Sequence, residues 1–165
     1  IDVSMWAAAL QLMYPFSVDA LSSGESPQRV GNKGYSGSPA SDYFPAKCGG
    51  FIAIGANTKP QIKKLYQVIG WSNHEADKDL ESTFGFARAR DPVAFRSKLA
   101  SALLSRTDQE WEDALQTAGV PAARLRSLGE FTREAQSAGA LTPSAHEFAG
   151  ASVLTPGLGW SDSCH

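Results

Sequence analysis

The sequence predicts a mixed α/β chain of the α+β kind, in which an antiparallel sheet containing a β-hairpin packs with several helices. An apolar run at residues 51–56 follows a Cys-Gly-Gly turn, which is typical of a hairpin. Apolar residues at helical spacing recur behind capping residues between 58 and 139. The chain has 165 residues, of which 42% are hydrophobic and 19% charged, enough for one globular domain without a second independent core.

The first segment, 1–21, is predicted to be helical, because Trp6, Leu10 and Met13 share one helical face. Pro15 is predicted to end this helix. The chain begins inside the helix and without a methionine, so we expect its amino terminus to be a cut. Segment 22–42 is rich in Gly, Ser and Pro and is predicted to be a long loop, either a substrate lid or a flexible crossing between domains.

Segment 43–139 is predicted to be a small α/β domain. A hairpin over 43–56 is followed by a helix that begins after Thr58 and ends at Gly70. The polar stretch 71–81 contains His74, Glu75 and Asp77, which lack the paired spacing of metal ligands, so we interpret it as a solvated loop and expect no metal site.

Three further helices and one strand are predicted in the same domain. The helices follow Asp91, Thr107 and Ser127, and an edge strand covers 120–125. We expect the aromatic residues Trp6, Trp111 and Phe131 to pack in cores, since aromatics at helical spacing usually do. Segment 140–165 shows no periodicity beyond a possible short strand at 153–154 and is predicted to be an irregular tail.

Composition excludes several classes of function. The net charge of −2 lacks the basic excess of a nucleic-acid-binding protein. The apolar runs are too short to span a bilayer, so we expect a soluble, cytoplasmic protein with no membrane partner. Cys48 and Cys164 are predicted to be free thiols. The motifs of serine hydrolases, P-loop proteins and dinucleotide-binding proteins are incomplete.

Several ordered blocks resemble the class III coenzyme A (CoA) transferase family, also called the CaiB/BaiF type, which includes formyl-CoA transferase and alpha-methylacyl-CoA racemase. They are the opening IDVSM and its small-residue helix, the pair Gly31-Asn32, the hairpin DYFPAKCGGFIAI, the helix end at 68–70, and the segment 106–122. The resemblance extends from Ile1 to about Gly139, and only faintly to the ending at 156–160.

The resemblance implies that segment 1–21 ends a large domain and that the chain is the carboxyl-terminal part of a two-domain, interlocked fold. Family members move CoA from an acyl-CoA to a carboxylic acid through an aspartate that forms covalent intermediates. That aspartate is expected upstream of Ile1, so we expect no catalytic residue here and no activity of the isolated chain. The substrate is a CoA thioester, and no covalently bound cofactor is expected.

A glycine-rich loop covers the active site in some of these transferases. The corresponding candidates here are Gly31, Asn32, Gly34, Ser36 and Gly37. The expected partners are acyl-CoA, a carboxylic acid, and either a second copy or a chain carrying the amino-terminal half, as an interlocked dimer. An acyl-CoA racemase, a non-catalytic subunit or remnant, and a binding module unrelated to CoA remain alternatives.

Overall fold

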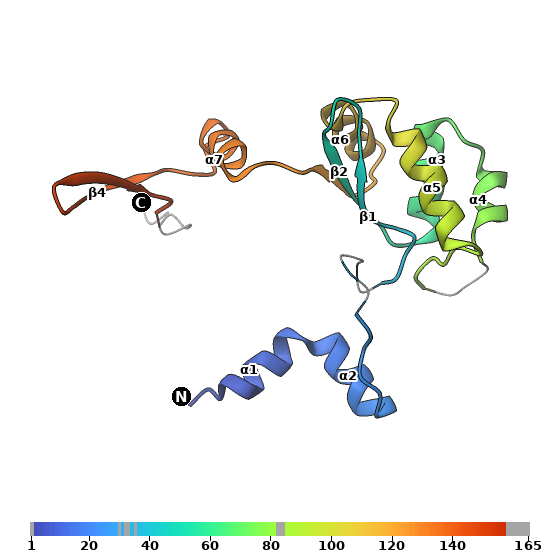
Figure 1. Cartoon of the computed structure of the whole chain (residues 1–165), viewed down its shortest axis with the longest axis horizontal. Helices are drawn as coiled ribbons and strands as arrows, with labels where there is room; N and C mark the ends of the chain where they lie inside the picture. The colour runs from blue at the N-terminus through green and yellow to red at the C-terminus, as the bar shows by residue number, and fades with distance from the viewer. Residues whose placement is uncertain (1, 30, 32–33, 35, 82–84, 158–165) are drawn as a thin grey trace, which may run out of the picture. The chain divides into compact units, whose positions relative to one another are not determined.

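The computed structural model describes residues 2–29, 31, 34, 36–81 and 85–157, and it divides the chain into two units, Ile1–Tyr35 and Ser36–His165. The described part is a mixed α/β structure with seven helices and antiparallel sheets, which confirms the predicted fold class (Figure 1). None of its helices is long and apolar enough to cross a membrane.

The first unit contains two helices, α1 (Met5–Leu12) and α2 (Tyr14–Ser23). Pro15 ends the predicted helix but also lies in the first turn of α2, where a missing N–H leaves no hydrogen bond unmade. Neither helix buries a residue in the described chain. The prediction that Trp6 packs in a core is therefore wrong for this chain, since 83% of its surface is exposed.

A three-stranded antiparallel sheet organises the second unit, with strand order β1-β2-β3. The strands are β1 (Ala40–Pro45), β2 (Phe51–Ala56) and β3 (Ala122–Arg124), which confirms the predicted hairpin and edge strand. Strand β1 begins inside the segment that was predicted as loop, because Ala40 already pairs with Ala56.

Three helices pack against this sheet: α3 (Lys59–Ile69), α5 (Pro92–Leu103) and α6 (Asp108–Thr117) (Figure 1). Each begins where the capping residues predicted it. The core between them and the sheet is formed by the largest fully buried side chains, which are Trp111, Tyr66, Phe44, Ile52, Ile62, Leu65, Leu80, Leu99, Leu103, Leu115 and Val120.

The polar stretch at 71–81 is not a loop, as predicted, but contains α4 (Asn73–Asp79), which lies against α3. A capping box begins this helix, because the Ser72 hydroxyl accepts from the Glu75 N–H and the Glu75 carboxylate accepts from the Ser72 N–H. The helix has one buried residue, Ala76, and so offers almost no apolar periodicity to the sequence.

Beyond β3, the structure contains α7 (Leu128–Ser137) and a second hairpin of β4 (Ser144–Phe148) and β5 (Ala151–Thr155). The prediction of an irregular tail is wrong over this hairpin, which turns through Ala149 and Gly150, both at positive φ. Helix α7 was predicted correctly, but it buries no residue, and Phe131 is 59% exposed. Phe131 is therefore not a core residue of this chain.

Candidate functional site

The predicted substrate loop is divided between the two units. Gly31 and Gly34 belong to the first unit, whereas Ser36 and Gly37 belong to the second. Asn32 lies outside the described residues. Gly31 and Gly37 have positive φ values of 70° and 63°, a backbone conformation that favours glycine.

Ser36 is buried and is fixed to the end of the sheet. Its hydroxyl donates to Asn57 Oδ1 at 2.6 Å and accepts from the Ser38 N–H at 3.2 Å. The Ser38 hydroxyl in turn donates to the Ala56 carbonyl at 2.6 Å. These contacts give Ser36 an anchoring role at the base of the loop, and its contact with substrate stays a prediction.

A basic side chain lies close to this base. A methyl group built on Gly37 would be 3.8 Å from Nη1 of Arg88. Arg88 is exposed, and the described residues give it no ion-pair partner. The end of the predicted loop is therefore positively charged.

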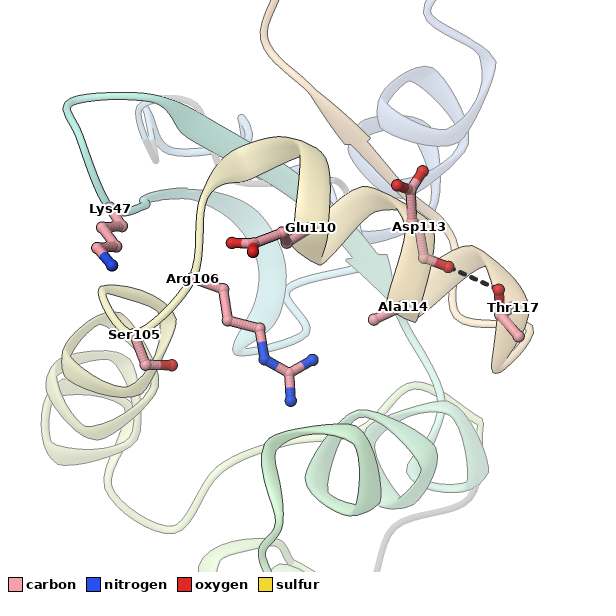
Figure 2. A pocket seen from close by; sticks show the side chains of 7 residues that line it. All are labelled: Lys47, Ser105, Arg106, Glu110, Asp113, Ala114 and Thr117. Carbon is pink, nitrogen blue, oxygen red and sulfur yellow. Dashed lines mark hydrogen bonds between the residues drawn. The ribbon is translucent and has the colours of Figure 1, made fainter.

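A hollow with a volume of about 630 Å³ lies beside α6 (Figure 2). Its side chains come from the β1–β2 turn, from the α5–α6 connection and from α6 itself. They are Lys47, Ser105, Arg106, Glu110, Asp113, Ala114 and Thr117. Sequence reasoning missed this site, since its two cations are 59 positions apart and lie in two separate blocks of the family resemblance.

The charged side chains around this hollow differ in whether they already accept or donate hydrogen bonds within the protein. The Glu110 carboxylate accepts from the Thr107 N–H at 2.8 Å and from its hydroxyl at 2.9 Å. These hydrogen bonds, with smaller contributions from Lys47 and Arg106, lower the pKa of Glu110. Figure 2 shows the Asp113 carboxylate pointing away from the Arg106 guanidinium. The hollow therefore presents two cations and two carboxylates, of which Glu110 already accepts two hydrogen bonds.

A second, smaller hollow of about 230 Å³ lies between α4 and α5. Within it, Asp79 accepts from the Tyr66 hydroxyl and from the Lys98 ammonium, both at 2.8 Å. Burial opposes ionisation of Asp79, but these two hydrogen bonds outweigh it and lower its pKa. Burial and the bond to Asp79 raise the pKa of Tyr66. Lys98 also lies over the Trp71 ring at 4.4 Å. These contacts join α3, α4 and α5, which is a structural role.

An ionic cluster joins α6, the end of β3 with the segment that follows it, and α7. Glu112 is only 5% exposed and accepts from Nη1 and Nη2 of Arg126 at 2.9 and 2.8 Å and from the Arg124 N–H at 3.0 Å. Glu134 on α7 pairs with both arginines. The Arg126 hydrogen bonds lower the pKa of Glu112 although burial opposes this.

The three residues considered as metal ligands, His74, Glu75 and Asp77, all lie on α4, and two of them already bind other groups of the protein. Glu75 takes part in the capping box, and Asp77 pairs with Lys59 at 2.8 Å and Lys63 at 3.0 Å. Across the described residues, no three His, Cys, Asp or Glu side chains form a group that could hold a metal ion. Cys48 is an exposed free thiol, and Cys164 lies outside the described residues.

Comparison with protein families identifies the class. The sequence model of CoA-transferase family III matches residues 1–157, which is nearly the whole chain. The chain therefore belongs to CoA-transferase family III. No curated protein matches it.

The solved structures similar to this chain include three of Rv3272 from Mycobacterium tuberculosis. A mutant of that protein superposes with a TM-score of 0.62 at 19% identity, over 93% of this chain and 38% of that chain. An orthorhombic form gives 0.60 at 21% identity, over 94% and 39%. A third, described as a hypothetical protein, gives 0.56 at 22%, over 84% and 35%. This likeness supports the fold, and the chain spans less than two fifths of the length of these structures.

Proposed function

We propose that this chain is the carboxyl-terminal part of a cytoplasmic CoA transferase of the CaiB/BaiF type, which moves CoA between an acyl-CoA and a carboxylic acid. The observation that carries the proposal is the family match over residues 1–157. The share of the similar structures that the chain covers, 38% in the first of them, supports its being one part of a larger assembly.

In the proposed reaction, an aspartate outside these 165 residues attacks the acyl-CoA thioester, and CoA leaves as its thiolate. The resulting mixed anhydride is attacked by that thiolate, which releases the first carboxylic acid and leaves an aspartyl thioester. The acceptor carboxylate then attacks the aspartyl carbonyl, giving a second anhydride and free thiolate. Attack of the thiolate on the acceptor's acyl carbon yields the new acyl-CoA and restores the aspartate.

The residues of this chain contribute shielding and assembly in this proposal. The loop with candidates Gly31, Gly34 and Gly37 would exclude water from the anhydride, since hydrolysis would waste it. Ser36 would hold the carboxyl end of the loop to the sheet through Asn57.

Exposed apolar side chains support the assembly role. Large apolar residues are exposed on α1, α2, α7, β4 and β5, whereas such groups on monomeric proteins are usually buried or scattered. Those on the two amino-terminal helices and at the residue between them are Met5, Trp6, Leu10, Leu12, Met13, Tyr14, Phe16, Val18 and Leu21. We propose that the exposed apolar side chains of all five elements, α7 included, are covered in an interlocked homodimer, or in a heterodimer with a chain that carries the amino-terminal half.

The test compares residues 1–165 alone with the same chain joined to, or coexpressed with, its upstream coding segment. With an acyl-CoA and an isotopically labelled carboxylic acid, we expect labelled acyl-CoA from the longer protein and none from residues 1–165. Mass spectrometry of the longer protein should detect a CoA adduct on one aspartate.

Parallel reactions in D₂O separate the alternatives. Deuterium at the carbon next to the thioester, without exchange of CoA, would overturn the transferase proposal in favour of a racemase. The absence of both reactions in the longer protein would favour a non-catalytic subunit. Exchange by residues 1–165 alone would show that the nucleophile lies within them.

A further inference from the structure

We propose that the hollow beside α6 binds a small organic anion, whose carboxylate or phosphate groups contact the Lys47 ammonium and the Arg106 guanidinium. This inference goes beyond the proposed transfer of CoA and does not depend on it. It rests on the placement of the two cations, on the support beneath Arg106, and on the state of the carboxylates around them.

The backbone brings the two cations together. Lys47 lies in the turn between β1 and β2, and its N–H donates to the Arg106 carbonyl at 2.9 Å. Lys47 also forms a parallel bridge with Thr107, at the start of α6. Segments far apart in the sequence are thus fixed side by side, and both side chains line the same hollow (Figure 2).

Arg106 has a rigid support. Its guanidinium carbon lies 4.7 Å from the centre of the Trp111 ring. Trp111 is itself 1% exposed and donates its indole N–H to the Leu103 carbonyl at 2.7 Å. Because a stacked guanidinium keeps its N–H donors at its edge, it can still bind an oxyanion through two hydrogen bonds. The stacking also reduces the conformational entropy lost on binding.

The two cations act on a nearby carboxylate without pairing with it, since both contribute to the lowered pKa of Glu110. Among the described residues, neither has an ion-pair partner, in contrast to Lys59, Lys63, Arg96, Lys98, Arg124 and Arg126. Two carboxylates line the same hollow. Glu110 already accepts two hydrogen bonds from Thr107, and Asp113 accepts one from Gln109 and points away from the Arg106 guanidinium (Figure 2). The capping box also closes the amino terminus of α6, so the helix end is not the proposed anion site.

The volume of about 630 Å³ is in the range of small-molecule sites, and the hollow is wide enough for more than one charged group. The smaller hollow between α4 and α5 also contains cations, but its volume is only about 230 Å³, and its Lys98 is already paired with Asp79. We therefore assign anion binding to the hollow beside α6.

The experiment is an NMR titration of ¹⁵N-labelled residues 1–165 with inorganic phosphate, and separately with succinate, each against sodium chloride at equal ionic strength. We expect saturable shifts at the backbone amides of Lys47 and Arg106 and at the Trp111 indole N–H. Tighter binding of phosphate would identify a phosphate ester as the ligand class, and tighter binding of succinate a carboxylic acid.

The variants Arg106→Gln and Lys47→Gln each remove one positive charge, and each should weaken binding by about tenfold, since charge-assisted hydrogen bonds are lost. Arg133→Gln on α7 removes the same charge elsewhere and should leave the affinity unchanged. Unchanged thermal midpoints would show that the variants fold. Equal weakening by Arg133→Gln, or equal shifts with sodium chloride, would overturn the proposal and leave only a general charge effect.

Discussion

Helices α6 and α7 are both ten residues long and both begin with a capping box, but only α6 is built into the core of this chain. Trp111 and Leu115 on α6 are buried against the sheet, whereas Leu128 and Phe131 on α7 are largely exposed. Helix α7 is tied to the rest by ion pairs of Glu134. The comparison teaches that capping and periodicity determine where a helix forms, but not whether its apolar face is covered by the same chain.

The strongest test of this comparison is the removal of one aromatic ring from each helix. Trp111→Ala should lower the free energy of unfolding by about 3–5 kcal/mol, because it leaves a cavity in the core. Phe131→Ala in the isolated chain should change it by less than about 0.5 kcal/mol, as is usual for an exposed residue. Urea denaturation followed by circular dichroism measures both.

The same pair tests the assembly role of α7. If Phe131→Ala destabilised residues 1–165 as much as Trp111→Ala does, α7 would already be packed in the isolated chain. In the longer protein, where we propose that α7 is covered, Phe131→Ala should become clearly destabilising while the cost of Trp111→Ala stays the same.

The contrast also shows how far the fold could be predicted from the sequence. Helices α3, α5, α6 and α7 have sharp starts because Thr58, Asp91, Thr107 and Ser127 cap them. The burial of Trp6 and Phe131 was predicted wrongly. Periodicity shows which face of a helix is apolar, but it does not show whether this chain covers that face. Helix α4 was missed because only one of its residues is buried, although its capping box was present in the sequence.

The candidate site was less predictable than the fold. The loop residues followed from one local sequence block, and their contact with substrate stays a prediction. The hollow beside α6 depends on a backbone pairing between Lys47 and Arg106, which no local pattern indicates. Family resemblance was more informative, because several ordered blocks together predicted a membership that the match over residues 1–157 supports.

The ionic cluster provides a second test, since its two acids lie on the two helices. Glu112→Gln on α6 should cost about 2 kcal/mol, because Arg126 would lose its charge-assisted hydrogen bonds to a buried carboxylate. Glu134→Gln on α7 should cost less, since solvent screens an exposed pair. Denaturation at pH 7 measures both, and an equal cost would contradict the contrast between the helices.

The pH dependence of stability gives an independent check on Glu112. Its pKa in the folded chain is lowered by the Arg126 hydrogen bonds, so its contribution is complete above the ordinary pKa of about 4.3. The contribution is lost as the pH falls from there through the folded pKa. The loss of stability in acid should therefore be smaller in Glu112→Gln than in the unmodified chain. If the free energy of unfolding falls equally with pH in both proteins, Glu112 does not cause the loss of stability in acid.

The smallest expected effects come from the caps, which are chemically matched in the two helices. The Thr107 hydroxyl accepts from the Glu110 N–H, and the Ser127 hydroxyl accepts from the Glu130 N–H, both at 3.3 Å. Thr107→Ala should lower the free energy of unfolding by about 1 kcal/mol, because α6 unfolds together with the core. Ser127→Ala removes an equivalent bond, but α7 buries nothing and can fray while the core stays folded. We therefore expect faster amide hydrogen exchange at the start of α7 and an unchanged denaturation midpoint. A shift of the midpoint equal to that of Thr107→Ala would mean that α7 unfolds cooperatively with the core despite its exposed face.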